Sequence, residues 1–238
     1  MKHRIDFSSL IIFEDDDYVA INKPPFVSTL NDRKDDVNLL LLAKQYTPNA
    51  QACHRLDKDT SGVLVFAKNP TAYRHLSMQF EGRTVEKIYH AVVGGVHNFR
   101  EKVVDAPIAK MDDGLVKISA KDGKPAQTYF TTLAVYRNHS LIECRPVTGR
   151  MHQIRIHLSV LKASITGDEP YGGKPLYVSD IKRGYNLKKF TDEQPLIKRM
   201  ALHAKCLMFK NLRGETVKVE APYPKDFRVL LRQLELNR

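Results

Sequence analysis

The sequence has little that would build a disulfide framework or cross a membrane. Its 238 residues include only three cysteines, Cys53, Cys144 and Cys206, which lie far apart and form no CxxC pair. This odd and scattered set argues against a disulfide scaffold or a zinc ribbon and is typical of a reducing compartment. No apolar run approaches the ~20 residues of a membrane helix, and residues 1–6 have no apolar segment that could begin a secretory signal. We therefore expect a cytoplasmic protein.

Sequence motifs for common cofactors are also missing. The glycine pairs at 94–95 and 172–173 lack the spacing of phosphate-binding or dinucleotide-binding loops. His152 and His157 are five residues apart, which on a helix places them about 140° from each other and not on one face. No Gly-x-Ser-x-Gly nucleophile elbow occurs. The sequence therefore predicts neither a metal nor an organic cofactor.

Negative charge is scarce in parts of the chain. The 38 Lys and Arg residues exceed the 27 Asp and Glu residues, for a net charge of +11. No acidic residue occurs from position 144 to 167, a window whose basic and histidine residues are Arg145, Arg150, His152, Arg155, His157 and Lys162. A second basic stretch contains Lys182, Arg183, Lys188, Lys189, Lys198 and Arg199. Such stretches can neutralise phosphates, so we expect a polyanionic partner, most simply nucleic acid.

The hydrophobic pattern predicts many strands and few helices. Strands are expected at residues 10–13, 18–22, 62–67, 85–93, 127–136, 140–147, 200–209 and 215–221. Helices are expected at residues 37–46, 70–80, 151–161 and 227–236, and Asn69 followed by Pro70 is a typical helix start. This mixture favours the α+β class, with a large mixed or mostly antiparallel sheet flanked by helices and loops. We expect one catalytic domain over residues 1–238, in which two lobes remain an option.

A polar loop precedes the strand expected at 62–67. It contains His54, Arg55, Asp57 and Asp59 and ends at Gly62. Asp and Ser make local backbone bonds and Gly permits unusual dihedrals, so the loop could be a plain turn. The two carboxylates also leave open acid–base chemistry of the glycosidase kind.

A second polar segment surrounds the helix expected at 151–161. Arg155 lies between Ile154 and Ile156, and Arg150 stands in the turn before the helix. An arginine in a partly buried place needs a carboxylate partner. A surface position for Arg155 remains the alternative.

Taken together, these segments resemble the RluA-type family of RNA pseudouridine synthases. Residues 54–62 (HRLDKDTSG) are similar to the family's catalytic-aspartate motif. The family's other motifs are matched in order by residues 18–24, 87–91, 148–157 with 167–168 and 171–172, and 201–204. The matches cover most of the chain from about residue 18 to 209.

The resemblance implies a pseudouridine synthase fold with an active-site cleft between two lobes, and isomerisation of uridine to pseudouridine in rRNA or tRNA. Asp57 would be the catalytic aspartate, acting either on ribose C1′ or on a sugar proton. The target uridine would first be flipped out of its stack. Because no atom is gained or lost in the isomerisation, no cofactor is implied.

The resemblance also implies roles for other residues. Arg55 would occupy the vacated base stack, and Tyr89 would stack on the flipped uracil. Arg155 would pair with Asp57. Leu202, or with less support Leu207, would form an apolar floor, although both could be plain core residues. The remaining substrate-binding candidates are Lys23, His54 and Arg150.

Two departures and two alternatives accompany this interpretation. Phe26 stands where the family more often has glycine, which leaves the local loop path open. The first motif begins within about 20 residues of the start, so we expect no N-terminal S4-type RNA-binding domain. We expect instead that a monomeric catalytic domain contacts the RNA directly.

A catalytically silent RNA-binding protein on the same scaffold is the first alternative. A glycoside hydrolase that uses Asp57 and Asp59 is the second, but it would not explain the basic charge.

Overall fold

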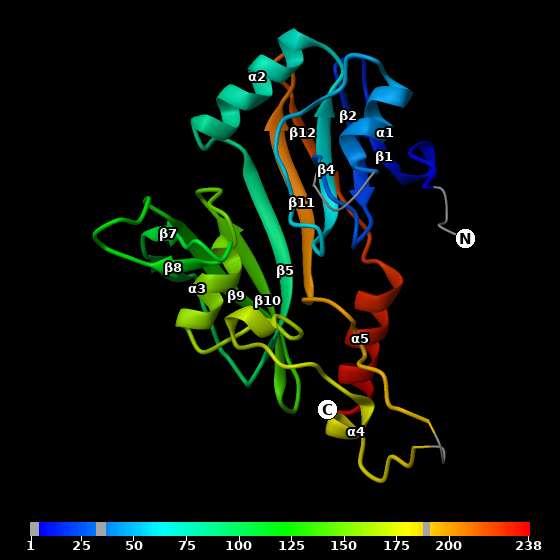
Figure 1. Ribbon diagram of the computed structural model, residues 1–238, viewed down its shortest axis with the longest axis vertical. Coiled ribbons are helices and arrows are strands. Elements are labelled where there is room, and N and C mark those ends of the chain that lie inside the picture. Colours follow the sequence, from blue (N-terminus) through cyan, green and yellow to red (C-terminus); the bar gives the residue numbers. More distant parts are fainter. Residues whose placement is uncertain (1–4, 32–36, 188–190) are drawn as a thin grey trace. The chain divides into compact units, whose positions relative to one another are not determined.

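The computed structural model describes residues 5–31, 37–187 and 191–238. Residues 1–4 of the N-terminal sequence, and Lys188 and Lys189 of the second basic stretch, lie outside the described residues. The chain forms two compact units, and Figure 1 labels most of their helices and strands. Unit 1 comprises Met1–Lys87 and Ala204–Pro222, and unit 2 comprises Ile88–His203 and Tyr223–Arg238.

Unit 1 is built on a sheet in which β2 pairs antiparallel with both β1 and β4. β3 also pairs with β4, and β12 pairs with β11, again antiparallel. The strands are β1 (Ile11–Glu14), β2 (Tyr18–Lys23), β3 (Gln51–Ala52), β4 (Ser61–Ala67), β11 (Leu202–Lys210) and β12 (Thr216–Glu220). A 3₁₀ turn, η1 (Ser8–Leu10), precedes β1, and the helices are α1 (Leu39–Tyr46) and α2 (Pro70–Glu81). The side chain of Asn69 accepts a hydrogen bond from the Ala72 amide, as the predicted helix start requires.

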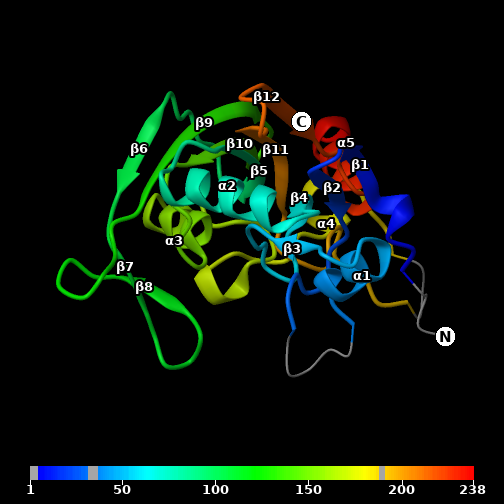
Figure 2. The same ribbon diagram turned by 90° about the horizontal axis from the view of Figure 1, so that it is seen from above.

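Unit 2 contains a sheet with the strand order β5-β10-β9-β6, in which β10 pairs antiparallel with β5 and β9, and β9 with β6. A separate hairpin of β7 and β8 extends beside it (Figure 2). The strands are β5 (Glu86–Gly94), β6 (Lys102–Asp105), β7 (Ile108–Lys110), β8 (Val116–Ile118), β9 (Gln127–Val135) and β10 (His139–Pro146). The helices are α3 (Gln153–Val160), η2 (Glu169–Tyr171), α4 (Val178–Ile181) and α5 (Lys225–Leu236). α3 contacts β8, β9 and β10, which places the predicted arginine helix against the sheet.

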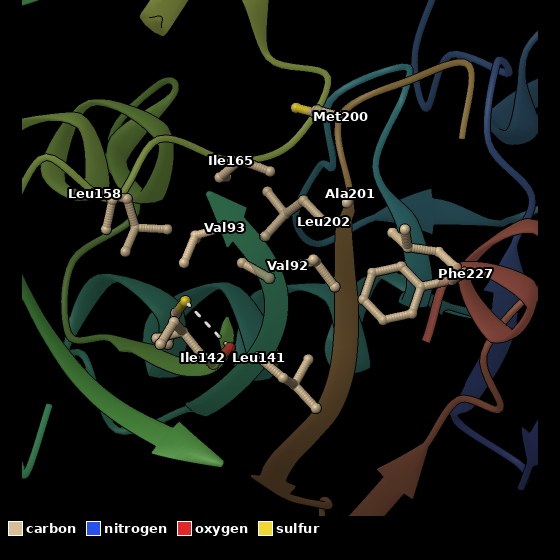
Figure 3. Packing of buried hydrophobic residues seen from close by; sticks show 14 of the residues in the cluster. Val92, Val93, Leu141, Ile142, Leu158, Ile165, Met200, Ala201, Leu202 and Phe227 are labelled. Carbon is tan, nitrogen blue, oxygen red and sulfur yellow. Dashed lines mark hydrogen bonds between the residues drawn. The ribbon is translucent and has the colours of Figure 1, made fainter. Parts of the chain in front are cut away.

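Each unit has its own apolar core. In unit 1, side chains of β2, β4, α2, β11 and β12 pack together, among them Tyr18, Val65 and Phe209. In unit 2, the core joins β5, β10, α3, α5 and the segment before β11 (Figure 3). Burial of these side chains is the main favourable term in folding of both units.

The predicted α+β class is confirmed, and the strand pairs described above are antiparallel. The short strands β3, β6, β7 and β8 were not predicted, because runs of two to four residues are too short to give a periodic signal. α3 begins later than predicted because His152 has a left-handed φ of 52° and cannot continue a helix. None of the helices in the described part of the chain has the length and apolar character of a membrane span.

Candidate active site

The loop that carries Asp57 runs between β3 and β4 in unit 1, and its path is fixed through the backbone. Asp57 is half-buried, and its carbonyl accepts a hydrogen bond from the Thr60 amide at 3.1 Å. The buried hydroxyl of Thr29 donates to the Leu56 carbonyl at 3.1 Å and accepts from the Leu56 amide at 3.2 Å. A single side chain therefore holds both polar groups of the residue before Asp57.

A buried lysine holds the other side of this loop. Lys23 ends β2 and is fully buried. Its ammonium donates hydrogen bonds to the carbonyls of Pro24 (3.0 Å), Lys58 (2.8 Å) and Thr60 (2.7 Å). A buried ammonium is stable only when its protons are used in this way. These contacts make Lys23 an anchor of the Asp57 loop, and its predicted contact with substrate stays a prediction.

Gly62 ends the loop for a steric reason. Its φ of 115° is a conformation that residues with a side chain rarely adopt. A Cβ atom at this position would lie 2.1 Å from the Ala204 carbonyl oxygen of β11. The glycine of the motif is therefore required by the close approach of β4 and β11.

His54 and Arg55 have different surroundings. The His54 Nε2 accepts a hydrogen bond from the Val65 amide at 3.1 Å, and its ring stacks on Phe80 with centroids 4.9 Å apart. Burial, with a further contribution from the positive charge of Lys87, lowers the pKa of His54 to about 3, so the imidazole is neutral at pH 7. Burial also lowers the pKa of Lys87 to about 8. Arg55 is exposed. His54 thus supports the strand that follows the loop, while Arg55 faces solvent.

The structure settles the loop path at Phe26. This residue has a left-handed φ of 67°, and its side chain is 53% exposed. The backbone therefore follows the path that a glycine would adopt easily, although a phenylalanine occupies it.

In unit 2, Arg155 of α3 has a carboxylate partner, Asp168. Arg155 Nε donates to Asp168 Oδ2 at 2.8 Å, and Nη2 donates to Oδ1 at 2.7 Å. The exposed fractions of the two side chains are 11% and 1%. Such a two-point pair fixes the plane of the guanidinium as well as its position. The predicted need of Arg155 for a carboxylate is thus met within its own unit, and its predicted pairing with Asp57, a residue of the other unit, stays a prediction.

Tyr171 extends this network. The Arg155 guanidinium lies over the Tyr171 ring, 4.7 Å from its centroid. The Tyr171 hydroxyl accepts a hydrogen bond from the Val116 amide of β8 and lies 2.9 Å from His152 Nδ1. The strained residue at the start of α3 is thereby tied to the same group of side chains as Arg155.

A chain of polar side chains fastens α3 to β9. Gln153 accepts from the Thr148 hydroxyl at 2.7 Å and donates to the Gln127 carbonyl at 2.9 Å and the Thr128 hydroxyl at 3.0 Å. His157 is fully buried, with Nδ1 2.9 Å from the Thr128 hydroxyl and Nε2 3.1 Å from the Ala106 carbonyl. Because the carbonyl can only accept, Nε2 carries the proton and Nδ1 accepts from Thr128. Burial lowers the pKa of His157, in agreement with this neutral form.

The basic window from residue 144 to 167 is less available for phosphates than predicted. Arg145 pairs with Glu101, and Arg155 is buried against Asp168. Arg150 is half-buried and its Nε donates to the Pro125 carbonyl at 3.1 Å. Lys162 is exposed. The window itself contains no acidic residue, but Glu101 and Asp168, which lie outside it in the sequence, neutralise two of its arginines.

The second basic stretch needs a similar correction. The Arg199 side chain is buried, pairs with Asp226 of α5 at 2.8 Å and donates to the Met200 and Leu202 carbonyls. Its role is structural, because a side chain so enclosed cannot face a phosphate backbone. Lys182, Arg183 and Lys198 are exposed.

The remaining candidates are hydrophobic or aromatic. Tyr89 of β5 is half-buried and packs against the unit 2 core. Leu202 belongs to that same core, together with Val92, Val93 and Ile165 (Figure 3). Leu207 belongs to the core of unit 1 and is 3% exposed. Of the two leucines, Leu207 is the one whose burial most favours a plain core residue over an apolar floor for the substrate.

Comparison with known proteins identifies the same family as the sequence motifs do. Residues 17–160 match the family model described as RNA pseudouridylate synthase. The chain belongs to the RNA pseudouridylate synthase family. It is accordingly an enzyme that isomerises uridine to pseudouridine in RNA, as the resemblance implied, and the silent RNA-binding and glycoside hydrolase alternatives are not supported.

Individual relatives match over nearly the whole chain. Ribosomal large subunit pseudouridine synthase D of Haemophilus ducreyi is 33% identical over 95% of this chain and 71% of its own length. The synthase D of Xanthomonas campestris is 36% identical over 94% of this chain and 69% of its own length. Among solved structures, human RNA pseudouridylate synthase domain containing 4 superimposes with a TM-score of 0.72 at 26% identity, over 96% of this chain and 95% of that one.

Two residues of the site, Thr29 and Asp168, were not predicted. Asp168 lies in the matched segment 167–168, so the motif marked its position but not its contact with Arg155. Thr29 lies 27 residues before Leu56, and no local pattern links the two. Both were missed because each acts on a residue that is distant in sequence.

Proposed function

We propose that Asp57 is the catalytic aspartate of this enzyme and that the substrate is ribosomal RNA of the large subunit. The observation that carries the proposal is the loop itself: Lys23 and Thr29 fix the backbone on both sides of a half-buried carboxylate. A carboxylate that reacts at a single ribose carbon has to be held in a fixed position, and this loop provides such a position. The printed names of the relatives point to large-subunit rRNA, and tRNA is the alternative RNA class.

The reaction breaks the bond between ribose C1′ and uracil N1 and forms a bond between C1′ and C5. The proton on C5 leaves, and N1 gains one, so atoms and charge balance without a co-reactant. The ionised Asp57 carboxylate either attacks C1′ or removes a sugar proton, and both routes require its charged form. The exposed guanidinium of Arg55 fills the stack that the flipped uridine leaves.

Tyr89 and Arg155 complete the proposed catalytic set. Tyr89 stacks on the flipped uracil, and Leu202 closes the pocket as its apolar floor. Arg155, held in plane by Asp168, pairs with the Asp57 carboxylate and keeps it ionised. Arg150 lies at the turn before α3 as a phosphate contact.

The protein as a whole is proposed to act as one catalytic domain, monomeric and cytoplasmic. The three cysteines are free thiols, which fits a reducing compartment. The exposed cations Arg55, Lys162 and Lys182 provide direct contact with the RNA backbone.

The test compares the protein with its Asp57→Ala and Asp57→Asn variants on a large-subunit rRNA transcript and on total tRNA. Pseudouridine is detected by carbodiimide modification and primer extension. Both variants should lose at least roughly 1,000-fold in rate, because the reacting group is removed. RNA affinity should stay within a few-fold of the parent. Isomerisation retained by Asp57→Ala would reject the assignment, and modification of tRNA alone would reject the substrate.

A further inference from the structure

Phe26 combines a strained backbone with an exposed aromatic ring. Its φ of 67° lies in the left-handed region, where a bulky residue is an outlier. The ring is 53% exposed, so packing in the core does not account for it. Glycine would adopt the same backbone without strain. Such outliers persist where the surrounding structure enforces them, and they concentrate at functional sites.

The two anchors of the Asp57 loop lie on either side of Phe26. Lys23, three residues before it, binds the Lys58 and Thr60 carbonyls, and Thr29, three residues after it, binds both polar groups of Leu56. Both ends of this short segment are therefore fixed to the loop that carries Asp57. This arrangement holds Phe26 in its strained conformation and places it in the same group of loops as Asp57.

Cations accompany the ring in this group of loops. Arg55 and Lys58 are both exposed and flank Asp57 in sequence. Aromatic rings beside positive charges are the usual platform for unpaired nucleotides, because any base can stack on a ring while the cations neutralise its phosphates. RNA around a flipped uridine offers such bases.

We propose that Phe26 is a stacking site for an unpaired RNA base next to the target uridine. This inference rests on the proposed function in one respect, namely that Asp57 marks the reaction centre. The base is a different one from the target, whose stacking partner is Tyr89.

Fluorescence provides a direct test, because the chain contains no tryptophan. A Phe26→Trp substitution in the Asp57→Ala background places a single indole at the site and prevents turnover. The matched control is Leu212→Trp, 39% exposed in the turn after β11. One end of β11 lies beside the Asp57 loop, because Ala204 contacts Gly62. The other end is Lys210, whose backbone is hydrogen-bonded to the Gln79 side chain of α2. Leu212 follows Lys210 and therefore lies at the end of the unit 1 sheet that is far from the Asp57 loop.

Both proteins are titrated with the large-subunit rRNA transcript and with a short single-stranded oligoribonucleotide. Stacking should quench the Phe26→Trp emission by about half or more, while Leu212→Trp should change little. Equal quenching at both positions, or none at position 26, would overturn the proposal.

Affinity and stability separate a binding role from a structural one. Phe26→Gly and Phe26→Leu, again in the Asp57→Ala background, should each weaken RNA binding by roughly 5- to 50-fold. Phe26→Gly should melt at the same or a higher temperature, because it removes the backbone strain. Unchanged RNA affinity in both variants, with a lower melting temperature, would instead make the ring a structural element. If RNA quenches the Phe26→Trp emission but the unmodified protein forms no pseudouridine, the proposed function is rejected and the stacking site stands.

Discussion

The two units hold their candidate catalytic groups in different ways. In unit 1, the loop with Asp57 is held through its carbonyl and amide groups by Lys23 and Thr29. In unit 2, Arg155 is held through its own guanidinium by Asp168 and Tyr171. Lys23 and Thr29 bind the Asp57 loop through its backbone and would remain in place if the Asp57 side chain were changed, whereas the side-chain pair makes Arg155 both a functional group and part of the framework.

This difference predicts which substitutions separate activity from stability. In unit 1, changing Asp57 should remove activity with little effect on folding, and changing its anchors should affect both. In unit 2, any single substitution at Arg155 or Asp168 should lower activity and stability together. Three further experiments test this contrast, first the two substitutions at neutral pH in order of expected effect and then the dependence on pH.

Loss of the buried ammonium should have the largest effect. Lys23→Met keeps much of the side-chain volume but leaves the carbonyls of Pro24, Lys58 and Thr60 without their donor. The free energy of unfolding should fall by about 4 kcal/mol, because each buried unsatisfied group costs about 1–3 kcal/mol. Urea denaturation measures this loss, and Lys44→Met, at an exposed position of α1, is the matched control. A change below about 1 kcal/mol would contradict the anchoring role.

Breaking the buried ion pair should have the next largest effect. Asp168→Asn leaves the Arg155 charge uncompensated at a site where Asp168 is 1% exposed. The expected loss in unfolding free energy is about 3 kcal/mol. The double variant Arg155→Met with Asp168→Leu should recover most of this stability but no activity, since a well-packed apolar pair can replace a buried ion pair. A stable and fully active Asp168→Asn variant would contradict the positioning role.

The third effect appears only at acidic pH and concerns His54 of unit 1, which is half-buried. His54 has a pKa of about 3 in the folded protein, against 6.5 for an unburied histidine. Between these values the unfolded chain binds a proton that the folded protein does not, so stability falls as the pH drops from 6.5 towards 3 and levels off below it. The contribution is about 1.4 kcal/mol per pH unit. His54→Gln can still accept from the Val65 amide, and it should lose this share of the pH dependence in denaturation curves at pH 4 to 7. An identical slope in both proteins would show that His54 titrates normally.

Several elements could be predicted from local sequence because their causes are local. Asn69 and Pro70 set the start of α2, and the pattern at residues 62–67 marked the buried strand β4. The same reasoning failed for the short strands β6 to β8 and for the electrostatics of the basic window. Arg145 finds Glu101 across the sheet of unit 2, and Arg199 finds Asp226 of α5. An acid-free stretch of sequence is not an acid-free region of space, because packing brings charges from distant segments.

By itself, the sequence determined the family and the fold class, and it singled out Asp57 as the candidate catalytic residue, since these depend on patterns of residues that lie close together in the chain. Only the tertiary structure decided that Lys23 and Thr29 hold the Asp57 loop, that Asp168 is the partner of Arg155 and that Phe26 has a left-handed backbone. Each of these features depends on hydrogen bonds or steric contacts between residues far apart in sequence. Such contacts form only when burial forces every polar group to find a partner, and local patterns do not record which partner it will be.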